Sequence, residues 1–141
     1  MKGFEFSLDT CLKMAKAAEE AQKEIGVSIT MAIADDCGNL KYFFRFGDAM
    51  LPSIELSQSK AYSSAVMSMS TSELGIIARY DGPAFGINVT CPKLVLFGGG
   101  VPLQVDGKTV GGIGISGATA DEDEVIAKQV AEVFRKASGQ L

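Results

Sequence analysis

Apolar residues recur at helical spacing near the start of the chain. Leu8, Cys11, Leu12 and Ala15 fall near one helix face, and Ser7 stands before them as a side chain that can cap a helix. Three later segments carry similar start signals, which are a proline in a first turn and two capping boxes. The pattern predicts four helices: Ser7 to about Ile25, Pro52 to about Met69, Ser70 through Arg79, and a last helix opening at Thr119.

Alternation with a period of two residues replaces the helical pattern in residues 27–34. Apolar side chains alternate there with small or polar ones, which is typical of a strand covered on both faces. Residues 35–39 are rich in turn formers, and residues 40–46 return as an aromatic-rich strand. These two strands are predicted to pair as a hairpin.

Glycine is concentrated in residues 97–117, where it occupies eight of 21 positions. Asp106-Gly107 lies there between two apolar alternations and favours a type I′ turn, because both central residues of that turn need positive φ. The segment therefore predicts a second hairpin. Before it we expect an irregular loop over residues 80–92 and a short strand over residues 94–97.

The order of these elements defines the fold class. Helix, two strands, helix, three strands, helix, with the strands joined in hairpins, describes an antiparallel α+β sandwich of order α-β-β-α-β-β-β-α. A length of 141 residues suits one domain, so we expect a single domain over residues 1–141.

Charge and hydropathy limit the classes of partner. The net charge is -4 and the 13 basic residues are scattered, which argues against a nucleic-acid partner because phosphate neutralisation needs clustered Lys and Arg. No run of ~18 apolar residues predicts a membrane span, and the first residues lack the apolar core of a signal peptide. We expect a soluble, cytoplasmic protein with no membrane partner.

The chain contains no histidine, which excludes Ser-His-Asp and Cys-His catalysis and removes the usual proximal haem ligand. Cys11, Cys37 and Cys91 are too few and too widely spaced for a zinc knuckle or a disulfide framework. No metal site is predicted.

Residues 112–117 match G-x-G-x-x-G, but a dinucleotide site is not expected. Such a site needs a second parallel strand and an acidic residue about 20 positions later. Here one helix ends the chain, and four carboxylates, residues 121–124, stand where a pyrophosphate would bind. The match indicates a glycine-rich strand, and the acidic run is explained by the helix dipole.

Two interpretations remain for the triglycine corner formed by Gly98, Gly99 and Gly100. Its glycines, followed by Pro102, permit a tight corner or the close approach of a second subunit, or they line the floor of a pocket for a flat ligand.

Lys60 stands among small, hydroxyl-rich residues of the second helix, so something large is expected to pack closely there: a helix, a subunit or a ligand. Together with Arg45 and Asp48 it is one of the charges expected near the open end of the sheet. A buried lysine would be a candidate base or carboxylate binder, and a solvated lysine is the simpler alternative.

Two segments resemble one family, the haem-binding family of GlcG, HbpS and the C-terminal domain of PduO. They are MAIADDCGNLKYFFRFGDAMLPSIELSQSKAYSSA and FGGGVPLQVDGKTVGGIGISGATADEDEVIA, and the second is the more specific. Seven residues of the first fall where the family pattern expects them: Asp35, Gly38, Arg45, Asp48, Ser53, Lys60 and Ala61.

This resemblance implies a profilin-like sandwich with a five-stranded antiparallel sheet, assembled into homo-oligomers (tetramers or octamers). It also implies tetrapyrrole binding, of haem or a corrinoid, in some members, and a setting in glycolate, propanediol or glycerol metabolism. A histidine ligand to haem cannot be carried over to this chain, whereas binding through backbone groups and apolar contact could be.

Our leading hypothesis is a non-enzymatic oligomeric accessory protein that binds a small molecule or tetrapyrrole in a groove bounded by the triglycine corner, Pro102, Arg45 and Lys60. One alternative is a cofactor-free enzyme that uses Lys60 or Asp35 as acid/base and Arg45 as carboxylate anchor. Another is a scaffold for an operon-encoded enzyme. The leading hypothesis requires the backbone of the corner to be open to a ligand or a second copy.

Overall fold

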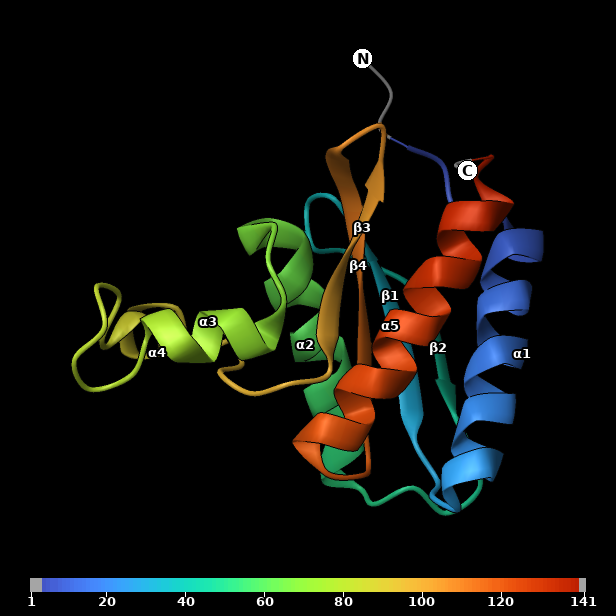
Figure 1. Ribbon diagram of the computed structural model, residues 1–141, viewed down its shortest axis with the longest axis horizontal. Coiled ribbons are helices and arrows are strands. Elements are labelled where there is room, and N and C mark those ends of the chain that lie inside the picture. Colours follow the sequence, from blue (N-terminus) through green and yellow to red (C-terminus); the bar gives the residue numbers. More distant parts are fainter. Residues whose placement is uncertain (1–3, 140–141) are drawn as a thin grey trace.

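A four-stranded antiparallel sheet forms the centre of the fold (Figure 1). The computed structural model describes residues 4–139. In spatial order the strands are β2 (Leu40–Arg45), β1 (Thr30–Asp35), β4 (Lys108–Ser116) and β3 (Gly100–Val105).

Helices cover both faces of the sheet (Figure 1). α1 (Leu8–Ile25) and α5 (Ala120–Ala137) pack side by side on one face, and α2 (Pro52–Met67) packs on the other. Two short helices, α3 (Thr71–Ile77) and α4 (Ile87–Thr90), belong to residues 71–92, which extend away from the sheet and are called the arm below. The α+β sandwich is thus confirmed.

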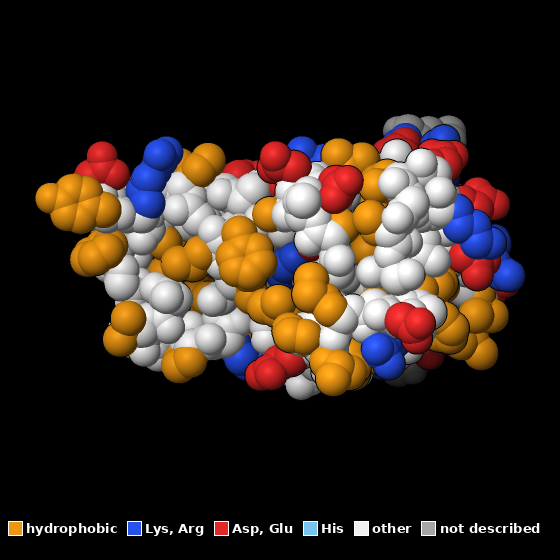
Figure 2. Space-filling view, turned by 90° about the horizontal axis from the view of Figure 1, so that it is seen from below, with side chains coloured by type: hydrophobic (Ala, Val, Ile, Leu, Met, Phe, Trp, Pro, Cys, Tyr) orange, Lys and Arg blue, Asp and Glu red, His pale blue; other side chains and the backbone are white. Residues whose placement is uncertain are grey.

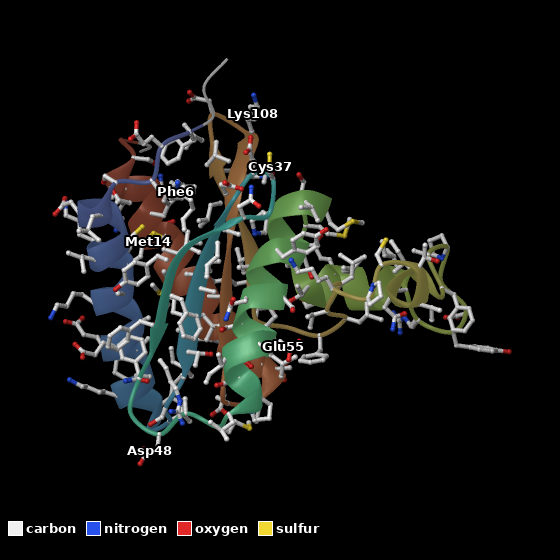
Figure 3. The ribbon with its side chains drawn as sticks, turned by 180° about the vertical axis from the view of Figure 1, so that it is seen from behind. Phe6, Met14, Cys37, Asp48, Glu55 and Lys108 are labelled. Carbon is white, nitrogen blue, oxygen red and sulfur yellow. The ribbon has the colours of Figure 1, made fainter. Side chains whose placement is uncertain are left out.

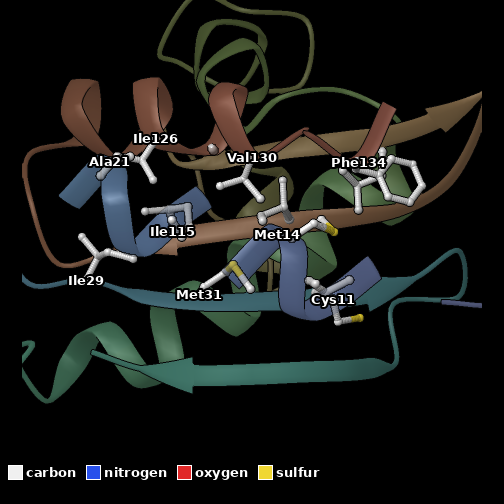
Figure 4. Packing of buried hydrophobic residues seen from close by; sticks show 14 of the residues in the cluster. Cys11, Met14, Ala21, Ile29, Met31, Ile115, Ile126, Val130 and Phe134 are labelled. Carbon is white, nitrogen blue, oxygen red and sulfur yellow. The ribbon is translucent and has the colours of Figure 1, made fainter. Parts of the chain in front are cut away.

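The main core lies between the sheet and the helix pair α1/α5 (Figure 4). Met31 and Ile33 of β1 point into it together with Met14 of α1 and Val130 of α5, all of them fully buried. The capping signals are confirmed as well: the Ser7 side chain accepts from Thr10 N, and Thr119 and Glu122 form a reciprocal capping box.

The opposite face of the sheet is built from much smaller side chains. Ala32 and Ala34 of β1 meet Ala61 and Ala65 of α2, and the neighbouring strand β4 presents glycines to the same helix. A Cβ on Gly114 would collide with the carbonyl oxygen of Ser57, and one on Gly112 with that of Ala61. The small-residue face of α2 therefore packs on a glycine strand of its own chain, so that helix and strand backbones approach closely.

The turn at Asp106-Gly107 is confirmed. Both residues have positive φ, 52° and 74°, and Val105 pairs with Lys108 across the turn. Strand limits differ from expectation by a few residues in the first hairpin, where β1 begins at Thr30.

The expectation of five strands is wrong, because residues 94–97 do not join the sheet. Val95 N donates to Ser63 Oγ of α2, and Gly75 of α3 packs against the carbonyl group of Leu96. The segment therefore runs along helices, where Leu94 and Val95 are buried, Leu96 is half-buried and Phe97 is exposed. The expected irregular loop before it contains the short helix α4.

Within residues 4–139, none of the helices combines the length and the apolar character needed to cross a lipid bilayer.

The glycine-strand packing predicts a contrast between two substitutions in one hairpin. Gly114→Ala has ordinary backbone angles but no room for a methyl group, and we expect it to cost about 3 kcal/mol of unfolding free energy through displacement of α2. Gly107→Ala has open space but positive φ, and should cost only about 1 kcal/mol. Urea denaturation measures both, and equal costs would contradict the packing argument.

Candidate functional site

Lys60 is buried inside the protein beneath the triglycine corner. Its side chain is 1% exposed, and its ammonium group donates to Ile115 O at 2.9 Å and to Asp123 Oδ2 at 3.1 Å. The ring of Phe97 lies 5.1 Å from Nζ and covers a third side of the cation. Lys60 therefore links α2, the end of β4 and the first turn of α5.

Burial shifts the pKa values of both partners of this pair. It lowers the pKa of Lys60 and raises that of Asp123, in each case because removal from water penalises the charged form, while their mutual attraction acts in the opposite direction. Asp123 also accepts from Ala118 N through its other oxygen. Because the two hydrogen bonds and the ring occupy the Lys60 ammonium, this group serves the fold and is not presented to a substrate.

The triglycine corner is covered by its own chain. A Cβ on Gly98 would lie 2.8 Å from Ala120 O, one on Gly99 would lie 2.5 Å from Lys60 Nζ, and one on Gly100 would lie 2.6 Å from Lys60 O. All three glycines are buried, and Gly100 N donates to Thr71 Oγ1. The expectation that this backbone is open to a ligand or a second copy is wrong, because α2 and the start of α5 fill the space.

The other predicted site residues lie in separate places. Arg45 donates twice to Ala49 O and so closes the loop after β2. Asp48 is exposed on that same loop, at its tip (Figure 3). Pro102 is half-buried on the edge strand β3 and faces a hollow beside Arg135. The structure does not bring these residues together with Lys60 in one groove.

Asp35, the alternative acid/base, stabilises the turn between β1 and β2. One of its carboxylate oxygens accepts from Cys37 N and Asn39 N. Asp35, Asp36 and Cys37 form the one group of metal-ligating side chains close enough to share an ion among the described residues, and it is a largely exposed turn. Turn geometry accounts for this arrangement.

A groove of about 570 Å³ opens between α2 and the irregular segment 92–97 and is called the α2 groove here. Pro52, Glu55, Leu56 and Ser59 repeat at helical spacing on one side of α2 and form its floor. The opposite wall and the end are lined by Asn88, Pro92, Lys93, Leu94, Val95, Leu96 and Phe97. Its volume falls within the range of ~300–1,000 Å³ that is usual for small-molecule sites.

The α2 groove continues across the outer side of the helix. Glu55 (labelled in Figure 3), Ser59 and Lys93 also line a second hollow of about 340 Å³, which reaches the turn at Gly38. The ammonium of Lys93 lies 4.2 Å from the ring centroid of Tyr62, one turn further along α2. An acidic and a basic side chain thus stand together beside mainly apolar walls.

A smaller apolar depression lies between α1 and β2 and is called the α1–β2 slot. It measures about 190 Å³ and is lined by Leu12, Ala15, Lys16, Glu19, Tyr42, Phe44 and Phe46. Its volume is below the usual range for a small-molecule site.

Sequence reasoning missed the α2 groove because half of it is irregular backbone. Glu55, Leu56 and Lys93 carry no motif, and residues 94–97 resemble a strand. The available signal was the helical spacing of Pro52, Leu56 and Ser59 opposite a segment that begins with Cys91-Pro92.

Comparison with known protein families identifies the family of this chain. The family model described as "Haem degrading protein HbpS-like" matches residues 6–132. The chain belongs to the HbpS-like family. An HbpS-like relative in Citrobacter freundii, an uncharacterised 15.0 kDa protein of the dhaT–dhaS intergenic region, is 31% identical over 91% of each chain.

Two further relatives are the proteins GlcG and PduO. Protein GlcG of Escherichia coli is 37% identical over 73% of this chain and 74% of its own length. The corrinoid adenosyltransferase PduO of Salmonella typhimurium is 33% identical over 82% of this chain, which corresponds to only 35% of PduO. The chain therefore spans about a third of that enzyme.

Solved structures of HbpS-like proteins share the fold. The complex of PduOC with heme superposes with a TM-score of 0.88 at 30% identity, covering 92% of this chain and 95% of the other. HbpS superposes with a TM-score of 0.83 at 30% identity, covering 94% and 92%.

The buried ion pair predicts strongly unequal effects of removing two lysines. Lys60→Met leaves the Asp123 carboxylate buried without its cation and should cost about 3–5 kcal/mol of unfolding free energy. Adding Asp123→Asn should recover part of that loss, since the asparagine still accepts from Ala118 N. The control Lys128→Met removes an exposed ammonium that pairs with the half-buried Glu124 of α5, and it should cost less than about 1 kcal/mol. Urea denaturation of the four proteins measures these differences, and a mild effect of Lys60→Met would contradict the structural role.

Proposed function

We propose that this chain is a non-enzymatic accessory protein that binds a flat, largely apolar molecule with carboxylate groups, of the tetrapyrrole class, in the α2 groove. Because the triglycine corner is covered by its own chain, this proposal replaces the groove predicted at that corner. The observation that carries the proposal is the combination of an apolar wall formed by residues 94–97 with the cation of Lys93 at the rim. Apolar surface binds a macrocycle face, and an ammonium group pairs with its carboxylates.

Size and relatives both support this choice. The α2 groove has about 570 Å³ against about 190 Å³ for the α1–β2 slot, so a tetrapyrrole is accommodated better on α2. PduOC has been solved in complex with heme, and PduO is named for a corrinoid substrate. Haem and corrinoids are therefore the two ligand types that we propose to consider first.

The binding role is favoured over the cofactor-free enzyme by the state of Lys60. The enzyme hypothesis needs an enclosed lysine beside a polar partner, and the Lys60–Asp123 pair meets that requirement. Yet no described groove reaches the Lys60 ammonium, and its contacts with Ile115, Asp123 and Phe97 leave no side for a substrate.

Assembly into homo-oligomers is supported by the arm. Its side chains include exposed apolar residues, among them Tyr80 at 88% and Phe85 at 67% exposure, whose rings contact each other edge to face. Apolar side chains gather over the arm in the space-filling view (Figure 2). Such surfaces mark protein interfaces, and we propose that a second copy covers this one in a tetramer or octamer.

The cytoplasm is the proposed location, supported by three free cysteine thiols among the described residues. The metabolic setting that we propose is the use of glycolate, propanediol or glycerol, in agreement with the names of the relatives. A partner enzyme from the same operon fits that setting. The small-residue face of α2 and the glycine strand β4 pack on each other, so neither surface is free to bind such an enzyme.

A pair of tryptophan substitutions tests the location of the site. Ser59→Trp places an indole on the floor of the α2 groove, and we expect porphyrin affinity to fall at least tenfold because the ring occupies the ligand's space. Lys16→Trp does the same in the α1–β2 slot and should leave the affinity unchanged. Titration of protoporphyrin IX followed by its fluorescence gives both values. Loss of binding in Lys16→Trp alone would move the site to the α1–β2 slot.

The role of the arm in assembly has its own test. Replacing Tyr80 and Phe85 by serine should raise the concentration at which oligomers dissociate at least tenfold, because exposed aromatic residues dominate interface energies. Val125→Ser, at a 50% exposed site on α5, is the control. Light scattering over a dilution series measures the mass, and an unchanged mass for the double variant would contradict the proposal.

A further inference from the structure

The side chains that usually bind haem iron lie outside the α2 groove. Haem iron is held by His, Cys, Met or Tyr, and the chain has no histidine. Cys11 and Met14 are buried in the core, and the exposed Cys37 and Cys91 do not line this groove. None of its eleven lining residues belongs to those four types. The groove therefore offers haem iron none of its usual side-chain ligands.

Recognition must then come from the periphery of the ligand. Leu56, Leu96 and Phe97, which are half-buried or exposed, offer apolar surface to a ring face. The Lys93 ammonium, held above the Tyr62 ring, offers a charge to a carboxylate, whereas the Lys60 ammonium is enclosed behind the Phe97 ring. Apolar contact and charge pairing do not depend on what occupies the centre of the macrocycle.

We infer that the α2 groove selects tetrapyrroles by ring face and carboxylates and gives the central metal no protein ligand. The inference rests on the proposed function and specifies its ligand class: iron-free porphyrins and their metal complexes are equivalent. It sets this chain apart from any relative that holds haem through histidine.

The test compares protoporphyrin IX with haemin on the full chain by isothermal titration calorimetry. We expect dissociation constants within threefold of each other. Lys93→Gln should weaken both ligands by the same factor, roughly 1.4- to fivefold, which is the range for one exposed charge pair. The visible spectrum of bound haemin at saturation should be the same in Lys93→Gln as in the parent protein.

Three outcomes would overturn the inference while the proposed function stands: haemin binding more than threefold tighter than protoporphyrin IX, Lys93→Gln weakening haemin alone, or a changed haemin spectrum in that variant. Each would show a bond from the protein to iron. If neither porphyrin binds, the proposed function fails and the inference fails with it.

Discussion

Close contact between α2 and the glycine strand β4 determines the rest of the structure. Because Gly112 and Gly114 have no side chains, the helix backbone lies directly on the strand, and there is no layer of large side chains between them. Lys60 faces the sheet in this narrow space, so its long side chain extends past the strand end to Ile115 O and Asp123. The triglycine corner then needs glycine because the lysine and the helix backbone already fill the space beside it.

Local patterns predicted most of the elements because side-chain periodicity and capping residues record what each element buries. Ser7, Thr119 and Asp106-Gly107 placed two helix starts and a turn correctly. The prediction of a fifth strand was wrong for a physical reason. A strand needs hydrogen bonds to a neighbouring backbone, whereas the periodicity of a sequence carries information only about its side chains. Residues 94–97 are apolar because they pack on helices. Val95 N donates to the hydroxyl of Ser63, which lies more than thirty positions earlier in the chain.

The candidate site was predictable only in part. The small neighbours of Lys60 correctly indicated close packing, yet its partner Asp123 belongs to an acidic run that the helix dipole already explains. Pairing across 63 positions leaves no local signal. The α2 groove leaves an even weaker signal in the sequence. It combines one face of a helix with an irregular segment whose course depends on contacts with Ser63 and Gly75.

The buried charges and the charges that line the α2 groove are therefore separated in this protein. The Lys60–Asp123 pair is buried and joins α2, β4 and α5, so changing either residue disturbs the fold. Glu55 and Lys93 stand on the surface beside a wall of irregular backbone, where substitution costs little stability. Proteins with this fold can therefore keep the glycine strand and the buried lysine while the residues that line the groove change. Members that share the fold can then bind different ligands, or bind the same ligand through different atoms.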